Sequence, residues 1–357
     1  MASLTQDIGT FISDLRYDHL PAVASPIIRN GFTDFVATVL LGRDDEVTNL
    51  VRKTLVGHSE NPEARLLLSS ESKSGISAAL VNGTASHSQD YDDVGLVGIQ
   101  PTHPSASIAP AIFAEAETLR RDGRAMVCAY AAAFEVWGEL ASRDLDPVHV
   151  KGWHPTGTFG AIAAAAAAAS LHGLSANAAA HAVSLAASMA AGVIANFGSM
   201  AKPYHAGRAA QSGVIAARLA AAGMTASDDA LESHLGFLAA ISPKGRVDRE
   251  SPAGFGGRWF LESHGLGFKL FPIAMGRTGH STGSSRCWRL RRSRRTMSSA
   301  SRSRPTGHNI PTSSTRTRRT RSMRSSAWNS PWRSPSWLGD ARARNSFPPL
   351  SIVPKFA

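Results

Sequence analysis

The run from Ala161 to Ala169, interrupted only by Ile162, restricts the fold of this chain more than any other feature of its sequence. Alanine has the highest helix propensity of all residues. Its small side chain also lets neighbouring helices approach closely. The run therefore predicts a helix that lies among other tightly packed helices.

Seven further segments before residue 273 are rich in good helix formers and are separated by Gly or Pro. None of them shows the period-two alternation that is typical of β-strands. With the Ala-rich segment, they are 27–41, 76–87, 108–120, 126–142, 157–171, 177–193, 206–222 and 230–240. We therefore predict a mainly α fold, with one all-helical domain over residues 1–272.

The charge balance changes sharply after Pro272. Residues 1–272 contain 20 Lys and Arg against 26 Asp and Glu, whereas residues 273–357 contain 18 Lys and Arg against one acid, Asp340. The second segment is rich in Ser and Arg and lacks the apolar periodicity that a core requires. We predict two parts: a helical domain, 1–272, and a disordered basic tail, 273–357.

Several features bear on the compartment and on metal binding. The first 18 residues contain Asp7 and Asp14 and no basic stretch before an apolar run, so we expect no secretory signal and a cytoplasmic protein. The most apolar stretches, 160–171 and 185–197, are shorter than the about 20 residues that cross a bilayer. Cys128 and Cys287 are too few for a zinc or iron-sulfur site. We expect reduced thiols and no metal cluster.

Three dipeptides, His103-Pro104, His154-Pro155 and Lys202-Pro203, stand directly before helical segments. Proline fits the first helical position, which would place the preceding basic residue at the N-cap. A helix N-terminus carries partial positive charge and free N–H groups, so a basic residue beside it favours an anion. One such step usually marks only a helix start, but three together suggest a polycarboxylate site. His205 and Arg208 follow Lys202 on roughly the same face.

Acidic residues follow the segment that contains His87, in the order Asp90-Tyr91-Asp92-Asp93. A carboxylate among cationic groups stays ionised and can act as a base toward a C–H next to a carboxylate. A solvated turn and a metal site are the alternatives. Because the helical segment contains no second carboxylate cluster, we expect no metal here.

Five ordered motifs resemble those of the helical domain of the MmgE/PrpD family. The resemblance covers essentially all of residues 1–272. The motifs are His87-Ser-Gln-Asp90-Tyr-Asp-Asp93, Thr102-His103-Pro104-Ser105, Trp153-His154-Pro155-Thr156-Gly157, Lys202-Pro203-Tyr204-His205-Ala-Gly207 and Phe268-Lys269-Leu270-Phe271-Pro272.

The resemblance implies a lyase or isomerase that works without a cofactor or metal. The family includes 2-methylcitrate dehydratase, cis-aconitate decarboxylase and iminodisuccinate epimerase. These reactions share a carbanion next to a carboxylate, so all three stay open, with a 2-methylcitrate dehydratase-like reaction as the main hypothesis. The resemblance also implies a small polycarboxylate substrate and a homodimer. We predict as catalytic residues Asp90, His103, His154 and Lys202, and as substrate-binding residues Lys269, His205, Arg208 and Tyr91.

One departure from the family pattern bears on the reaction. Val94 follows the Asp-Asp pair where the decarboxylases have Thr, and the loop from there to His103 is longer. This difference argues against decarboxylation.

The segment after Pro272 also departs from the family. The family continues with Cys-Tyr-Gly-x-His-Arg-Ala-hydrophobic-Asp and an α+β lid domain, whereas this chain continues with residues 273–282 of quite different sequence. Codons for these residues permit the expected string when read in a shifted frame, so we interpret the tail as a frameshift product. The alternatives are a nucleic-acid-binding arm, through the Arg-rich runs 289–295 and 316–324, and an inactive fragment whose site lacks its lid.

Overall fold

The computed structural model describes residues 3–57 and 60–269, and this part of the chain is mainly helical, as the sequence predicts. Its longer helices are α1 (Leu4–Asp14), α2 (Ala24–Gly42), α3 (Glu46–Leu55), α4 (Gly75–His87), α5 (Pro104–Thr118), α6 (Gly123–Ser142), α7 (Pro155–His172), α8 (Ala176–Met189) and α9 (Ala201–Ala221). The shorter ones are α10 (Phe237–Ile241), α11 (Phe260–Ser263) and the 3-10 helices η1 (Tyr17–His19), η2 (Val148–Lys151) and η3 (Ile194–Asn196).

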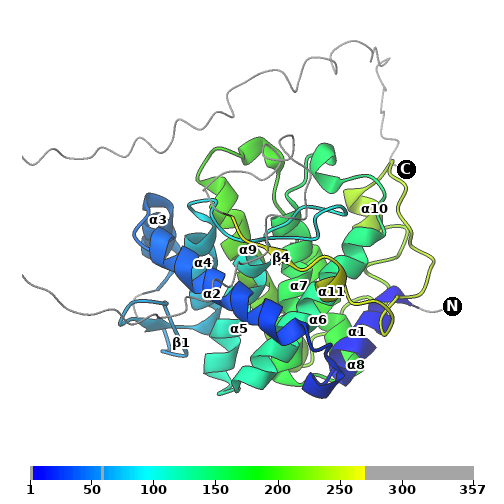
Figure 1. The fold of residues 1–357 in the computed structure, drawn as a ribbon, viewed down its shortest axis with the longest axis horizontal. Helices are drawn as coiled ribbons and strands as arrows, with labels where there is room; N and C mark the ends of the chain where they lie inside the picture. The colour runs from blue at the N-terminus through cyan, green and yellow to red at the C-terminus, as the bar shows by residue number, and fades with distance from the viewer. Residues whose placement is uncertain (1–2, 58–59, 270–357) are drawn as a thin grey trace, which may run out of the picture. The chain divides into compact units, whose positions relative to one another are not determined.

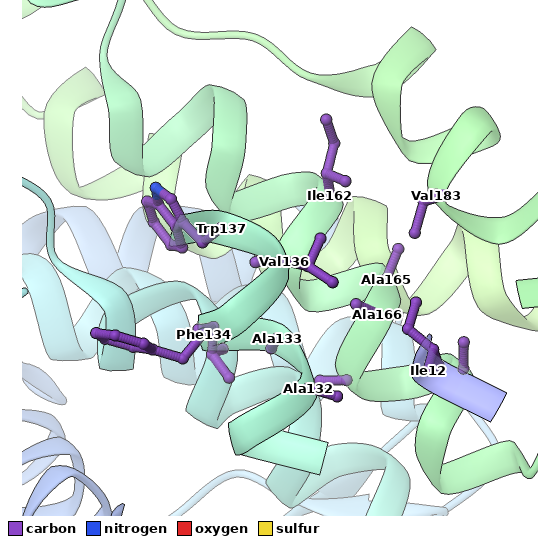
Figure 2. Close-up of a cluster of buried hydrophobic side chains, with 14 of the residues drawn as sticks. Ile12, Ala132, Ala133, Phe134, Val136, Trp137, Ile162, Ala165, Ala166 and Val183 are labelled. Atoms are coloured by element: carbon purple, nitrogen blue, oxygen red, sulfur yellow. The ribbon is translucent and has the colours of Figure 1, made fainter. Parts of the chain in front are cut away.

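The Ala-rich helix α7 lies in the middle of the other helices (Figure 1). Every residue from Pro155 to Ala169 is buried, because α5, α6, α8 and α9 all pack against it. Figure 2 shows Val136 of α6, Ala165 of α7 and Val183 of α8 in one apolar cluster. The prediction that the alanine run forms a closely surrounded helix is therefore confirmed.

Glycines allow α9 to lie against its neighbours at backbone distance. A Cβ atom at Gly213 would lie 2.5 Å from the Cβ of Ala164 in α7. At Gly207, a Cβ atom would lie 2.3 Å from the carbonyl oxygen of Leu80 in α4. These close approaches hold α9 against α7 at Gly213 and against α4 at Gly207.

A pair of two-residue strands brings the end of the described chain to the loop after α4. Strand β3 (Val94–Gly95) pairs antiparallel with β4 (Leu266–Gly267), and Val94 lies opposite Gly267. Gly95 also forms a bridge with Thr102, directly before α5. The second pair, β1 (Ala64–Arg65) with β2 (Ser72–Lys73), precedes α4. The β3–β4 pair therefore places Lys269 near residues 90–93.

The helix predicted over residues 230–240 is wrong in its first half. Residues 228–236 form turns and bends, and helix α10 begins only at Phe237. Leu231 is fully buried, and its N–H donates to the hydroxyl of Thr5 in α1. Glu232 accepts hydrogen bonds from the hydroxyls of Ser3 and Thr5. These contacts with the N-terminal segment outweigh the local helix propensity of the sequence.

Several predictions concern residues that lie outside the described part of the chain: Leu270, Phe271 and Pro272 of the last motif, and the tail 273–357 with Cys287. Cys128 is a buried free thiol, and burial raises its pKa to about 11. Within residues 3–57 and 60–269, the structure contains no helix that is both long enough and apolar enough to span a bilayer.

Candidate active site

Two of the three predicted helix starts are confirmed. His103 is the N-cap of α5 and His154 is the N-cap of α7, and in each helix proline occupies the first position. Neither histidine side chain caps its helix by a hydrogen bond, so both rings are available for other contacts. Each His-Pro pair therefore places its imidazole side chain directly before the first turn of a helix.

The N-cap position predicted for Lys202 is wrong. Helix α9 begins two residues earlier than predicted, at Ala201, with Met200 as its N-cap. The turn at Ser199 starts the helix, since the N–H of Lys202 donates to the carbonyl of Ser199 at 3.2 Å. Pro203 is tolerated in this first turn because backbone N–H groups there have no intrahelical acceptor. Lys202 consequently projects from the first turn rather than from the cap.

Two lysine ammonium groups converge on one carboxylate. Lys202 Nζ lies 2.8 Å from Asp90 Oδ1, and Lys269 Nζ lies 2.9 Å from the same oxygen. Lys269 Nζ also donates to the backbone carbonyl of Asp90 at 2.8 Å. Burial opposes the ionisation of Asp90, but the nearby Lys202, His103 and Lys269 together hold its pKa below the ordinary value. Asp90 is thus an ionised carboxylate between two cations.

Asp92 lies between two imidazoles. Its Oδ2 is 2.8 Å from Nδ1 of His87 and 3.3 Å from Nδ1 of His103. The buried Asp92 carboxyl group keeps a pKa well below its ordinary value, despite its burial, because His87, His103 and Lys269 surround it. An ionised carboxylate only accepts hydrogen bonds. The Nδ1 atom of His87 therefore carries the hydrogen.

His103 is oriented by backbone as well as by Asp92. Its Nδ1 lies 2.9 Å from the carbonyl oxygen of Asp93, which can only accept a hydrogen bond. Nδ1 must therefore be the protonated nitrogen. Nε2 points toward Asp90, with 3.9 Å to Oδ1. In the neutral ring this nitrogen has a free lone pair that can accept a proton.

His154 joins His87 to His205. The His154 ring stacks on His87 with 5.7 Å between centroids, and its Nδ1 lies 3.1 Å from Nδ1 of His205. The rings of Phe197 and His154 lie edge to face, with 4.8 Å between their centroids. Burial lowers the pKa of His154 well below its ordinary value, and the neighbouring His87 and Lys202 lower it further. Burial also lowers the pKa of His87, to about 4, so both rings are neutral near pH 7.

Asp93, the last residue of the 90–93 loop, contacts a second carboxyl group, that of Asp34 in α2. The N–H of Asp93 donates to Asp34 of α2 at 2.9 Å, and the Asp93 carboxyl group contacts the Ser105 hydroxyl, which also contacts Tyr130. Burial and the Asp34 charge raise the pKa of Asp93 well above its ordinary value. Burial and Asp92 likewise raise the pKa of Asp34, to about 6. A proton held by this pair keeps the buried loop from accumulating negative charge.

Four side chains offer atoms that could ligate a metal ion: His87, Asp90, Asp92 and His103, with donor atoms within 4.8 Å of one another. Their surroundings do not fit an ion, however. Lys202 and Lys269 place ammonium groups on Asp90 Oδ1, where a cation would have to bind. A divalent ion would meet two positive charges within contact distance. We therefore assign none of these residues as metal ligands.

The structure brings together six of the eight residues that the sequence nominated: Asp90, His103, His154, Lys202, Lys269 and His205. Arg208 instead donates to Gln211 at 3.0 Å on the surface of α9. Tyr91 follows Asp90 directly in the chain, and its role in substrate binding stays a prediction.

Sequence reasoning missed three contributors, His87, Asp92 and Phe197. Both His87 and Asp92 belong to the motif that nominated Asp90, so their place in that motif was the available signal. Phe197 has no such signal, because η3 and the turn after it place the ring against His154.

Comparison with known proteins gives relatives for most of the described chain. The sequence is 30% identical to cis-aconitate decarboxylase of Homo sapiens over 286 residues, which cover 76% of this chain and 57% of that protein. It is 30% identical to the mouse cis-aconitate decarboxylase over 284 residues, covering 76% and 56%. The Aspergillus terreus cis-aconitate decarboxylase is 27% identical over 275 residues, covering 72% and 55%. The chain thus spans a little over half the length of these relatives.

The match to a protein family covers more than half of the chain. The model of the MmgE/PrpD N-terminal domain matches residues 6–250, which include most of α1, all of α2 to α10 and all nominated site residues except Lys269. This agrees with the first four of the five motifs, since the fifth lies beyond residue 250. The chain belongs to the MmgE/PrpD family.

Proposed function

We propose that the site of this chain is that of a cofactor-independent lyase, which removes a proton α to a carboxylate of a small polycarboxylate. The observation that carries the proposal is the convergence of Lys202 and Lys269 on one point beside His103. Two ammonium groups can hold substrate carboxylates and stabilise the negative charge that develops when the α-proton leaves. A neutral imidazole beside them can accept that proton.

His103 is the residue that we assign as base. Its Nδ1 donates a hydrogen bond to the Asp93 carbonyl, so Nε2 is the nitrogen that faces Asp90, which both lysines contact. Asp90 is a weaker base in the ligand-free protein, because both ammonium groups stabilise its ionised form. We assign His154, a neutral ring that packs on His87, to proton transfer at the leaving group. Lys202 and Lys269 bind the carboxylates.

Two outcomes of the shared carbanion step have support. Elimination of water, as in 2-methylcitrate dehydratase, is our main hypothesis. It is favoured by Val94, which is buried in β3 where the decarboxylases have Thr. Loss of CO2 is the second candidate, because the relatives reported above are named cis-aconitate decarboxylases. The site thus supports a carbanion next to a carboxylate, which forms by loss of a proton in the dehydration and by loss of CO2 in the decarboxylation.

A direct assay separates these reactions. The purified chain is incubated in parallel with 2-methylcitrate and with cis-aconitate, and the products are followed by the absorbance of the new double bond and by release of CO2. The main hypothesis predicts water loss from 2-methylcitrate without CO2 release. Release of CO2 from cis-aconitate would instead select the second candidate. If neither compound reacts, and deuterium from D2O does not enter either one, the proposed proton abstraction is wrong for this chain.

We also propose that the enzyme acts in the cytoplasm and as a homodimer. The dimer follows from the family resemblance. Sedimentation of the purified chain tests the dimer directly, because a single species at 37.7 kDa would exclude it.

A further inference from the structure

Both site lysines contact the same atom, Asp90 Oδ1. Their ammonium groups lie 2.8 Å and 2.9 Å from it and come from segments 67 residues apart, α9 and the chain after β4. The Lys269 side chain is 2% exposed and that of Lys202 is 12% exposed, whereas the Asp90 side chain is 27% exposed. The cations are thus largely buried, and the anion between them is the member of the trio that is most open to solvent.

The backbone presents the Asp90 carboxylate to both lysines. Asp90 follows α4 in the left-handed conformation, with φ of 51°. Aspartate and asparagine adopt this conformation more readily than other residues with a Cβ atom. The carbonyl of Asp90 accepts a hydrogen bond from Lys269 Nζ at 2.8 Å, so the same ammonium group holds both the backbone and the side chain. Asp90 is therefore fixed at the point where the lysines meet.

The charges of the cluster leave no ammonium group for an incoming anion. Asp92 is already paired with His87 and lies 4.0 Å from Lys269. His87 and His154 are neutral rings, for the reasons given above. Among the described residues, the ammonium groups that contact the cluster are those of Lys202 and Lys269, and both already bind Asp90. A substrate carboxylate can pair with them closely only by taking over contacts that Asp90 now makes.

We propose that Asp90 is an internal counter-anion that holds the place of a substrate carboxylate between Lys202 and Lys269 and is displaced when the substrate binds. This inference rests on the proposed function, since it assumes that the site takes a polycarboxylate. Asp90 keeps two buried ammonium groups paired in the empty site, where unpaired charges would be costly. The same contact lowers substrate affinity, because each new ion pair replaces an existing one.

A purely structural ion pair makes the opposite prediction about binding. If Asp90 only ties α4 to α9 and to the chain after β4, its removal loosens the site and weakens binding of any anion. If Asp90 competes with the ligand, its neutralisation frees two positive charges, and an anion binds more tightly. The sign of the change in affinity therefore separates the two roles.

The experiment measures binding of propane-1,2,3-tricarboxylate by calorimetry to the full chain and to Asp90→Asn. This tricarboxylate has no hydroxyl group or double bond, so it cannot be dehydrated. Asp18→Asn is the matched control, because Asp18 forms an exposed ion pair with Arg124. We expect Asp90→Asn to bind on the order of tenfold more tightly than the wild type, which is the scale of one charge-assisted contact. The control should bind like the wild type.

A second measurement does not depend on the variant's folding. In a crystal structure of the wild type with the tricarboxylate, ligand oxygens should lie within hydrogen-bond distance of Lys202 and Lys269, and Asp90 Oδ1 should have left at least one of them. Equal or weaker binding by a folded Asp90→Asn, or a complex in which both lysines stay on Asp90, overturns the inference alone. If the tricarboxylate binds to neither the wild type nor the variant, the proposed function fails and this inference fails with it.

Discussion

The Nδ1 atoms of His154 and His205 lie 3.1 Å apart, so one ring donates the shared hydrogen and the other accepts it. A Cβ atom at Gly192 would lie 3.2 Å from the His205 ring, which shows how closely the backbone confines it. The sequence nominated His205 as a substrate-binding residue. In the structure its Nδ1 shares a hydrogen with Nδ1 of His154, so the tautomers of the two rings depend on each other, and the role of His205 in substrate binding stays a prediction.

We expect His205→Leu to lower kcat about tenfold, the scale of one lost hydrogen bond, while KM changes little. His205→Asn should recover part of kcat, because an amide can still pair with Nδ1 of His154. Steady-state kinetics of both variants provide the measurement. A rise in KM at constant kcat would return His205 to its predicted role in substrate binding.

Lys202→Met should weaken binding of propane-1,2,3-tricarboxylate by about 10- to 150-fold, which corresponds to loss of one hydrogen bond to a charged group. Methionine keeps most of the length of the lysine side chain, so packing changes little. Lys244→Met, at an exposed position, is the control and should bind like the wild type. Wild-type affinity in Lys202→Met would remove this lysine from the proposed site.

His154→Ala should abolish turnover while the fold is retained, because the ring makes no capping hydrogen bond to α7. Thermal melting and turnover, measured on the same preparation, separate the two effects. Unfolding of this variant at room temperature would show that the buried ring is needed for structure rather than for chemistry.

Glu135 should make stability depend on pH. Its buried carboxylate accepts hydrogen bonds from the N–H groups of Phe260 and Leu261, and burial raises its pKa from 4.5 to about 7. Between these values the folded protein keeps a proton that the unfolded chain releases. This contribution to the free energy of unfolding is therefore full below about pH 4.5 and is lost as pH rises through about 7.

We expect the melting temperature of Glu135→Gln, relative to the wild type, to increase from pH 5 to pH 8. The change corresponds to on the order of 2 kcal/mol, because one pKa unit equals about 1.4 kcal/mol and the folded protein keeps the proton over about two pH units of this range. The exposed Glu250→Gln serves as control and should give a flat difference. A flat difference for Glu135→Gln as well would contradict the raised pKa.

Gly213→Ala should destabilise the protein by about 1–3 kcal/mol, the usual cost of overpacking a core. The added Cβ would lie 2.5 Å from Ala164 of α7, so the two helices must move apart. Gly123→Ala, in the first turn of α6, has no atom within 4 Å of the added Cβ and should be neutral or stabilising. Chemical denaturation of both variants gives the comparison, and equal stabilities would refute the close packing of α7 and α9.

Local sequence signals determined most of the longer helices and the starts of two of them. The alanine run became the buried helix α7, and the His-Pro steps placed His103 and His154 at N-caps, because propensity and capping depend on adjacent residues. Helices α1 and α3 were not predicted. In α1, the burial of Leu4, Ile8 and Ile12 against α8 stabilises the helix, and a partner helix cannot be identified from local sequence.

The motifs also identified Asp90, His103, His154, Lys202, His205 and Lys269, but not how they pair. Lys269 lies 179 residues from Asp90 and reaches it through the pairing of β3 with β4. Asp92 contacts His87 and His103 because the loop after α4 folds back toward the start of α5. Hydrogen bonds and ion pairs act over a few ångströms, and only the packing of α4, α5, α9 and the β3–β4 pair brings these groups within that range.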